Sequence, residues 1–449
     1  MNGDNFLNSE AAERLEFRII LPLFLIVMID AFSITIILPL LPYYAVAFGL
    51  DTLGLGILLA TSPALELMSG PMYRIFSKKL GRKPVLIGSQ LGTVMGFLLL
   101  GAASTVWMLF VARIIDGIAG GNNSIGNRLV RDSLTPSNRT HGMGLIEAAY
   151  SLGFLAGPMV GFVTLALTDN DYRMIPYVAA LISLLAVILS FFVSKETLPP
   201  EMRKSSGLSS RERIAARYGP LRKPLVLFTL ALLFLVQFSY IGFIEFYGWL
   251  ALNRLGMNAL GTAILWVLGA VLIIIVDALI VGRLSLKFSE RWLVLVGMGM
   301  LVAGLILAAT TPQMAVNWYS KSEIIEELTL EESFLGDVPV NVHIPELLPP
   351  EDSAGWLGLG WFLIALSLIM IGGSLLVPAI KSLLMRDQTE YGISGVMSTS
   401  SILYKAVLLI APLVLGFSIL QAGFTAPFLV EAVILGIFLV FAYFVLVRE

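Results

Sequence analysis

The stretch IPYVAALISLLAVILSFFVS, residues 175–194, contains no charged side chain. A helix of about 20 apolar residues can cross the hydrocarbon core of a bilayer, which is about 30 Å thick. Similar stretches lie on both sides of it, and the full set covers residues 19–43, 53–76, 84–104, 106–129, 141–166, 175–194, 225–251, 260–282, 292–311, 355–380, 393–420 and 423–446. The sequence therefore predicts a polytopic membrane protein.

Composition supports helices as the spanning elements. Hydrophobic residues make up 57% of the chain and charged residues 13%. The apolar runs lack the alternation of a barrel strand, and in lipid a helix satisfies its backbone within one segment. We therefore expect an all-α membrane protein with 12 transmembrane helices in two pseudo-symmetric six-helix bundles.

Several classes of protein are excluded or disfavoured. The chain has no cysteine, so disulfides, thiolate metal sites and cysteine nucleophiles are unavailable. The net charge of -2 suggests no nucleic-acid partner. There is no G-x-S-x-G, H-E-x-x-H or phosphate-loop motif, so we expect no enzyme activity, no metal and no cofactor. An acidic tail leads straight into the first span, and a cleaved signal peptide is not expected.

Basic residues indicate the orientation. Of the 29 Lys and Arg residues, 24 fall in the loops and tails on the side that holds both termini. By the positive-inside rule, this side is the cytoplasm. We expect a multi-pass protein of the cell membrane, in contact with the lipid bilayer and monomeric.

Two polar segments divide the chain. The basic segment 195–224 is typical of a cytoplasmic linker, which gives an N-terminal bundle over 1–194 and a C-terminal bundle over 225–449. The segment 312–354 holds nine acidic residues and one lysine and is predicted to face outside. Within it, SEIIEELTLEESF favours a short amphipathic helix. We expect a solvated cap here rather than a lid that gates a ligand.

Two motifs carry a resemblance to a known family. SLGFLAGPMVG in the fifth span contains Gly153, Gly157, Pro158 and Gly161, and LFVARIIDGIAGG in the fourth contains Arg113, Asp116 and Gly117. Together with LGRKP after the second span, they resemble the major facilitator superfamily, specifically its twelve-helix drug:proton antiporter branch of the tetracycline-exporter and vesicular-amine-transporter type. Small residues four apart also allow two helices to approach closely, and proline bends a span.

The resemblance implies proton-coupled efflux of amphiphilic cationic or zwitterionic small molecules by alternating access. Arg113 in an apolar span needs an anionic partner, and Asp30 lies at a similar depth when about 1.5 Å is counted per residue. Spans 1 and 4 line the central cavity in this family. We therefore predict that Asp30 carries the coupling proton, the substrate cation, or each in turn, with Arg113 adjusting its proton affinity. A static salt bridge is the alternative.

Other polar residues in the spans are weaker candidates. Glu66 and Glu147 are possible proton carriers, with pairing to Arg128 as the alternative. Possible cavity-lining residues are Asn122, Asn123, Gln237, Tyr240, Tyr247, Tyr404 and Lys405. Pro39 and Pro42 are predicted to bend the outer end of span 1.

The resemblance implies that the inner loop takes part in gating at the inner face, but this loop departs from the family pattern. The pattern G-x-x-x-D-R-x-G-R-K has Arg74 in place of its first glycine and Lys78 in place of the aspartate, although Lys79, Gly81, Arg82 and Lys83 remain. We predict that Glu390 or Asp132 compensates by pairing with Lys78.

Two other functions stay open. A uniporter or an importer of a small polar metabolite needs no intramembrane carboxylate. A non-transporting receptor or scaffold would depend on the acidic outer segment, so deletion of about 315–350 would abolish its function.

Overall fold

A computed structural model of the protein describes residues 21, 23–33, 35–120, 139–193, 221, 223–276, 287–316, 318–329, 344–350, 355–386 and 390–447. Among these residues, ten helices are long and apolar enough to cross a membrane, and Ala259–Ile275 is a shorter apolar helix. The described part of the chain is helical and contains no strand. The all-α membrane fold predicted from the sequence is confirmed.

The described parts of the chain form two compact units, which we treat separately. Unit 1 comprises Met1–Leu38 and Ala64–Ser206, and unit 2 comprises Pro39–Pro63 and Gly207–Glu449. The predicted bundle boundary at 195–224 lies almost entirely outside the described residues and stays a prediction. The sequence did not predict that the hairpin Pro39–Pro63, which runs from the end of the first predicted span into the start of the second, would pack with the C-terminal helices.

Unit 1 contains the inner part of the first span and the helices α4, α5, α7 and α8, together with most of α3. Their bounds are α3 Thr52–Lys79, α4 Arg82–Gly101, α5 Val106–Ala119, α7 Arg139–Leu167 and α8 Met174–Val193. Helix α4 packs against both α5 and α8. Helix α4 begins after Gly81, which has a φ of 105°. Residues other than glycine rarely adopt this backbone conformation.

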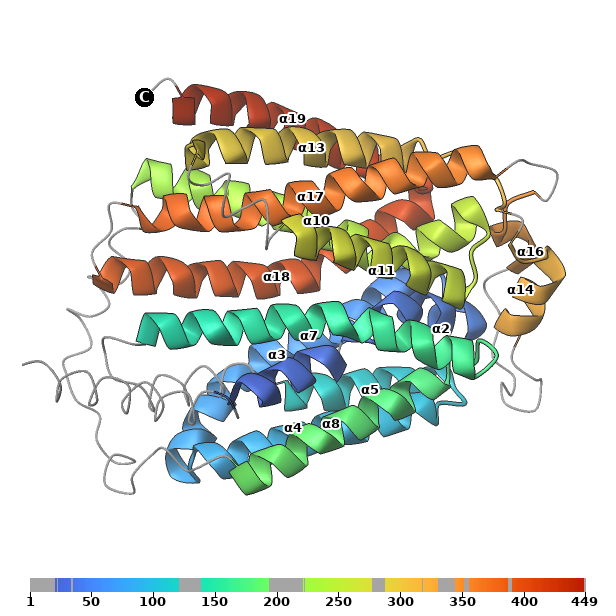
Figure 1. Cartoon of the computed structure of the whole chain (residues 1–449), viewed down its shortest axis with the longest axis horizontal. Coiled ribbons are helices and arrows are strands. Elements are labelled where there is room, and N and C mark those ends of the chain that lie inside the picture. Colours follow the sequence, from blue (N-terminus) through green and yellow to red (C-terminus); the bar gives the residue numbers. More distant parts are fainter. Residues whose placement is uncertain are drawn as a thin grey trace, which may run out of the picture. The chain divides into compact units, whose positions relative to one another are not determined.

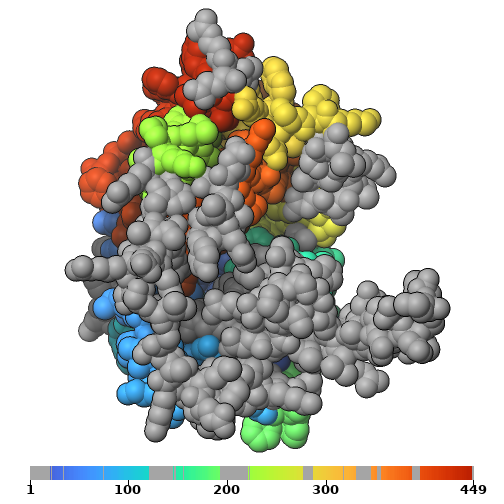
Figure 2. Space-filling model, turned by 90° about the vertical axis from the view of Figure 1, so that its left-hand side faces the viewer, coloured from blue at the N-terminus to red at the C-terminus, as the bar shows by residue number. Residues whose placement is uncertain are grey.

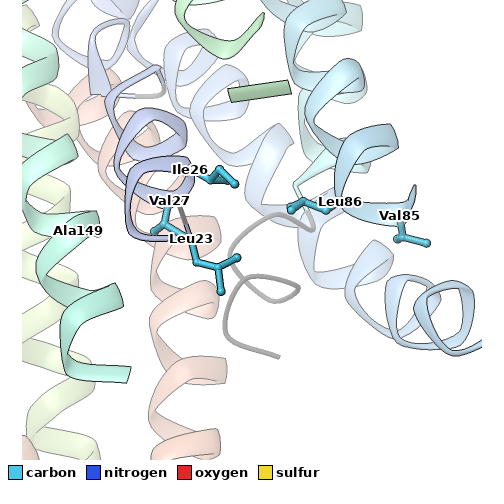
Figure 3. Close-up of a cluster of buried hydrophobic side chains, with 6 residues drawn as sticks. All are labelled: Leu23, Ile26, Val27, Val85, Leu86 and Ala149. Atoms are coloured by element: carbon cyan, nitrogen blue, oxygen red, sulfur yellow. The ribbon is translucent and has the colours of Figure 1, made fainter. Parts of the chain in front are cut away.

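A small apolar cluster joins three helices of unit 1. It is built from Leu23, Ile26 and Val27 of the first span, Val85 and Leu86 of α4, and Ala149 of α7. Figure 3 shows where these residues lie on the three helices, with Ile26 and Leu86 directed toward each other. The cluster anchors the inner half of the first span, which carries Asp30.

Unit 2 holds the C-terminal helices. Their bounds are α10 Pro224–Leu255, α11 Ala259–Ile275, α13 Glu290–Ala309, α17 Trp356–Met385, α18 Glu390–Ala422 and α19 Thr425–Val447. Helix α13 packs against α17 and α19, and the three lie side by side at the end seen in Figure 2. Proline at the start of α10 and left-handed Gly256 after its end follow the usual asymmetry of helix termini.

Helix α19 has one buried face and one exposed apolar face. Its buried face includes Phe428, Ala432 and Leu435, whereas Val433, Ile437 and Phe441 are exposed. The exposed face is apolar, as a surface in contact with acyl chains requires.

The first span is interrupted near its predicted outer end. Residues 23–33 are helical, Leu38–Leu40 form a 3₁₀ turn, and α2 covers Leu41–Ala47. Pro39 lies in the turn and Pro42 at the start of α2, as expected for residues that break a helix.

The acidic segment contains two short helices, α14 Lys321–Leu328 and α16 Ile344–Leu347. They lie at the end of unit 2 where α10 finishes and α17 begins (Figure 1). The predicted amphipathic helix is thus present as α14. It exposes Glu323 and Glu326, but it buries Ile324 and Leu328, so it is packed against the unit rather than solvated on all sides.

Candidate functional site

The glycines of the motif in α7 face the first span. A Cβ on Gly153 would collide with the backbone oxygen of Met28 and lie 2.9 Å from Ala31 Cβ. A Cβ on Gly157 would collide with Thr35 Oγ1 and lie 2.8 Å from Ile36 N. Only glycine therefore permits this separation between the two helices.

The rest of the motif fits the same contact. Thr35 Oγ1 donates to the Gly153 carbonyl oxygen at 3.3 Å. At Gly161 an added Cβ would lie 3.4 Å from Ile36 O, which is an ordinary contact. Pro158 lies inside α7 beside Gly157. We name this contact, made by Gly153, Gly157 and Thr35, the inner seam.

Asp30 lies on the stretch of the first span that forms the inner seam. It is half-buried, between Met28 and Ala31, which both meet Gly153. A carboxyl group at this depth in an apolar span is unusual and marks a functional candidate.

Arg113 has a partner on its own helix. Its Nη1 lies 3.0 Å from Asp116 Oδ2, and both side chains are about 10% exposed. Among the described residues, none accepts a hydrogen bond from the Arg113 Nε. The predicted pairing of Arg113 with Asp30 stays a prediction, and the pairing with Asp116 was not foreseen. The signal was the three-residue spacing, which places both groups on one face of a helix.

Glycine also positions this ion pair. A Cβ on Gly96 of α4 would lie 3.3 Å from Asp116 Cβ and 3.1 Å from Ala112 O. The backbone of α4 therefore closes over the acidic partner and restricts access of water to it.

The last turn of α5 is bonded by hydroxyl groups from its neighbours. Ser69 donates to Gly117 O at 3.4 Å, Tyr73 to Ile118 O at 2.8 Å, and Ser89 to Ala119 O. These bonds satisfy carbonyl groups that a helix end leaves unpaired. Glu66 lies alongside, because a Cβ on Gly120 would be 2.8 Å from Glu66 Cγ.

Two basic residues of the inner loop make hydrogen bonds to other residues of unit 1. Arg82 is buried and donates to Ser77 Oγ at 2.8 Å, and Lys83 Nζ donates to Phe191 O at 2.6 Å. Lys78 and Lys79 are exposed. Sequence reasoning assigned these residues to gating and missed the structural bonds of Arg82 and Lys83.

Several predicted residues lie outside the part of the chain that the structure describes. These are Asn122, Asn123 and Asp132, together with the side chains of Arg74, Glu147 and Glu390. The proposed compensation of Lys78 therefore stays a prediction.

The candidates in unit 2 lie in different surroundings. Tyr247 is fully buried and donates to Thr262 O at 3.0 Å. Tyr240 packs its ring over Gly373 and directs its hydroxyl to Met370 Sδ at 3.7 Å. Gln237 is buried with an unbonded Oε1, while Tyr404 and Lys405 are half-buried. Tyr247 thus occupies the position of a core residue.

Sequence reasoning gave little weight to Tyr43, which the structure makes prominent. Its side chain is fully buried in unit 2, and its hydroxyl bonds to Met257 O at 2.8 Å, Asn258 O at 2.9 Å and Thr262 Oγ1. A tyrosine near a span end is more often part of the interfacial belt, so its type and position gave no signal.

Comparisons with known proteins agree with the sequence motifs. The family model described as Major Facilitator Superfamily matches residues 23–325. A tetracycline resistance protein, class H, from Pasteurella multocida is 30% identical over 297 residues, which cover 65% of this chain and 72% of that protein. Major facilitator superfamily domain-containing protein 10 of Mus musculus is 28% identical over 42% of this chain and 47% of that protein.

Solved structures share the fold. The human organic anion transporter MFSD10 matches with a TM-score of 0.60 at 21% identity, covering 95% of this chain and 99% of that one. The nucleoside transporter NupG matches with a TM-score of 0.67 at 12% identity, covering 96% and 99%. At these identities the likeness extends to the fold alone.

Proposed function

Because the chain belongs to the major facilitator superfamily, we propose that this membrane transporter is a proton-coupled antiporter that exports amphiphilic cationic or zwitterionic small molecules. Transport would proceed by alternating access between the two bundles, with the proton gradient as the energy source. We place the protein in the cell membrane as a monomer with both termini in the cytoplasm.

The observation that carries the proposal is the buried Arg113–Asp116 pair on α5. Breaking a buried pair by removing one partner leaves an uncompensated charge in a region of low dielectric. Protonation of Asp116 would likewise leave the positive charge of Arg113 uncompensated. The guanidinium would then require another anion.

Asp30 supplies that anion in our scheme. It lies on the helix that forms the inner seam, and the family arrangement brings spans 1 and 4 to one cavity. A proton taken up by either carboxyl changes the counter-charge available to Arg113. Exchange of protons between the two sides can thus be linked to movement of the helices that carry these groups.

The substrate class rests on the relatives and on composition. The tetracycline resistance protein indicates a drug-sized organic molecule. Acidic side chains in the spans favour a cationic group on that molecule.

An organic anion is the second candidate. The Arg113 Nε is buried, has no hydrogen-bond partner in the described part of the chain, and can donate to an anionic group. The human transporter MFSD10, which shares the fold, is described as an organic anion transporter.

A transport assay in proteoliposomes with an imposed pH gradient tests the proposal. Tetracycline and a fluorescent organic anion serve as probes. We expect gradient-driven movement of tetracycline, and a loss of at least tenfold for Asp30→Asn and for Asp116→Asn. The matched control is Asp171→Asn, because Asp171 forms a partly exposed pair with Arg173 at 3.3 Å in a loop. Such a pair contributes about 0–1 kcal/mol, and transport should be unchanged.

The outcomes separate the alternatives. Full gradient-driven transport by Asp30→Asn would remove this residue from the coupling mechanism. Transport that ignores the gradient would identify a uniporter. Selective movement of the anion would favour the second candidate.

A further inference from the structure

The turn between α10 and α11, residues 256–258, is held from two sides in unit 2. On one side, the buried hydroxyl of Tyr43 bonds to the carbonyl oxygens of Met257 and Asn258 and to the hydroxyl of Thr262. Tyr43 belongs to α2, so these bonds fix the predicted outer end of the first span to the start of α11.

On the other side, the acidic segment is fastened to the end of α10. Met314 N donates to Arg254 O at 2.9 Å, and Val316 N donates to Leu255 O at 2.8 Å. Further along the segment, the Asn253 side chain donates to Leu347 O at 2.8 Å. The segment therefore returns to the same helix end from both of its halves.

Helix α14 completes the contact. Ser320 and Glu323 form a capping box at its start, which fixes a short helix that would otherwise be marginal. Its apolar residues Ile324 and Leu328 are buried, and it packs against α2 and α16. The acidic segment thus reaches α2 directly as well as through the turn.

A carboxylate of α14 lies at the first turn of α11. Glu327 Oε1 accepts from Ala259 N at 3.4 Å, and the N-cap Asn258 accepts from Gly261 N at 2.9 Å. Negative charge at a helix N-terminus is stabilising. Burial and the Glu327 carboxylate raise the pKa of Tyr319, which also meets Asn258.

A pocket of about 420 Å³ lies beside these contacts. Gly256, Trp318, Tyr319, Glu323 and Pro349 are among its lining residues.

We propose that helix α14, with Met314 and Val316 before it, is a strap that keeps the predicted outer end of the first span closed, by fixing the α10–α11 turn on which Tyr43 docks. The proposal rests on transport by alternating access. Opening of the outer end requires Tyr43 to leave Thr262, and Glu327 opposes this because it orders the turn of α11 that presents Thr262.

Site-directed labelling tests the strap, since the chain has no cysteine of its own. Val46→Cys places a reporter on α2, where the native side chain is buried. In right-side-out membrane vesicles, a membrane-impermeant maleimide labels this cysteine only when the outer end opens. We expect Glu327→Ala to speed labelling about fivefold, which corresponds to about 1 kcal/mol.

The matched control is Glu326→Ala, which makes the same charge change at an exposed position of α14. It should leave the labelling rate at the starting value. Equal rates for Glu327→Ala and Glu326→Ala would overturn the proposal.

Ala149→Cys, in the buried cluster of unit 1, should stay unlabelled in every variant, so that unfolding is recognised. If Ala149→Cys is labelled in the Glu327→Ala variant, Glu327→Gln is used instead. We expect Glu327→Gln to speed labelling of Val46→Cys about twofold.

A double-mutant cycle tests the connection through the turn. Tyr43→Phe removes the hydroxyl and keeps the ring. If both residues act on the same turn, the double variant should label more slowly than the product of the two single effects predicts. Effects that multiply would show that the strap acts independently of Tyr43 and overturn the proposed route. Labelling needs neither substrate nor proton gradient, so a failure here is distinct from a failure of proton coupling.

Discussion

The inner seam of unit 1 and a second seam in unit 2 are built from the same chemistry in different arrangements. In the inner seam, two glycines of one helix, Gly153 and Gly157 of α7, meet the first span. Thr35 of that span donates to the Gly153 carbonyl oxygen at 3.3 Å. Both glycines and Pro158 lie on a single helix.

The second seam, which we call the outer seam, joins α3 and α18. A Cβ on Gly56 of α3 would collide with Pro412 O of α18, and one on Gly416 of α18 would collide with Thr52 O of α3. Thr52 Oγ1 donates to Gly416 O at 3.0 Å. Each helix supplies one glycine, and the proline-bearing helix is again one of the pair.

The distribution of the glycines over one helix or two determines whether such a seam can be predicted from the sequence. Two glycines four residues apart on one helix form a recognisable pattern, and that pattern pointed to the inner seam. Single glycines on two separate helices form no pattern along the chain. The outer seam became visible only when the two helices were placed side by side.

The largest effect is expected at the outer seam. Gly56→Ala forces a methyl group against a backbone carbonyl, which cannot rotate away, so α3 and α18 must separate. We expect a loss of about 3 kcal/mol in the free energy of unfolding, at the upper end of the usual range for overpacking. Denaturant unfolding of the detergent-solubilised protein measures it.

Gly70→Ala on the same helix is the control, because no atom of the described residues lies within 4 Å of a Cβ there. It should be neutral or slightly stabilising, since alanine is the better helix former. Equal losses for the two variants would show that the outer seam is not tightly packed.

The fold could be predicted from the sequence to a large extent. Length and hydropathy of the apolar runs set the spans. The packing of the hairpin 39–63 with unit 2 could not be predicted, because it depends on tertiary contacts. The buried hydroxyl of Tyr43 shows this, since its partners lie more than 200 residues away.

The candidate site could be predicted only in part. Arg113 and Asp30 can be recognised as unusual in the sequence, because placing any charged side chain in an apolar span costs free energy, whatever its neighbours are. The choice of partner is a matter of geometry. Asp116 accepts from Arg113 at 3.0 Å, a contact that the sequence spacing allows without requiring it.

A smaller effect is expected at Gly157 of the inner seam. In Gly157→Ala the new methyl group meets the Thr35 hydroxyl, which can rotate, although Ile36 N at 2.8 Å cannot. We expect a loss of about 2 kcal/mol, measured in the same unfolding assay. Gly161→Ala, one turn further along α7, meets only an ordinary contact and should cost much less. If Gly161→Ala were as costly, the motif would be sensitive to helix propensity rather than to close approach.

The smallest effect concerns the two threonines, and it tests whether the seams share a mechanism. Thr35→Val and Thr52→Val each remove a hydroxyl that bonds to a glycine carbonyl of the other helix and keep the side-chain shape. Interhelical bonds of this kind contribute about 0.6 kcal/mol on average in membrane proteins. Thr164→Val is the control, because its hydroxyl donates within its own helix, to Val160 O at 2.8 Å. A loss for both seam variants beyond that of the control would show that the bond adds to the close packing. A loss at Thr52 alone would mean that the inner seam depends on its glycines, since Thr35 also bonds to Ala31 O at 3.0 Å within its own helix.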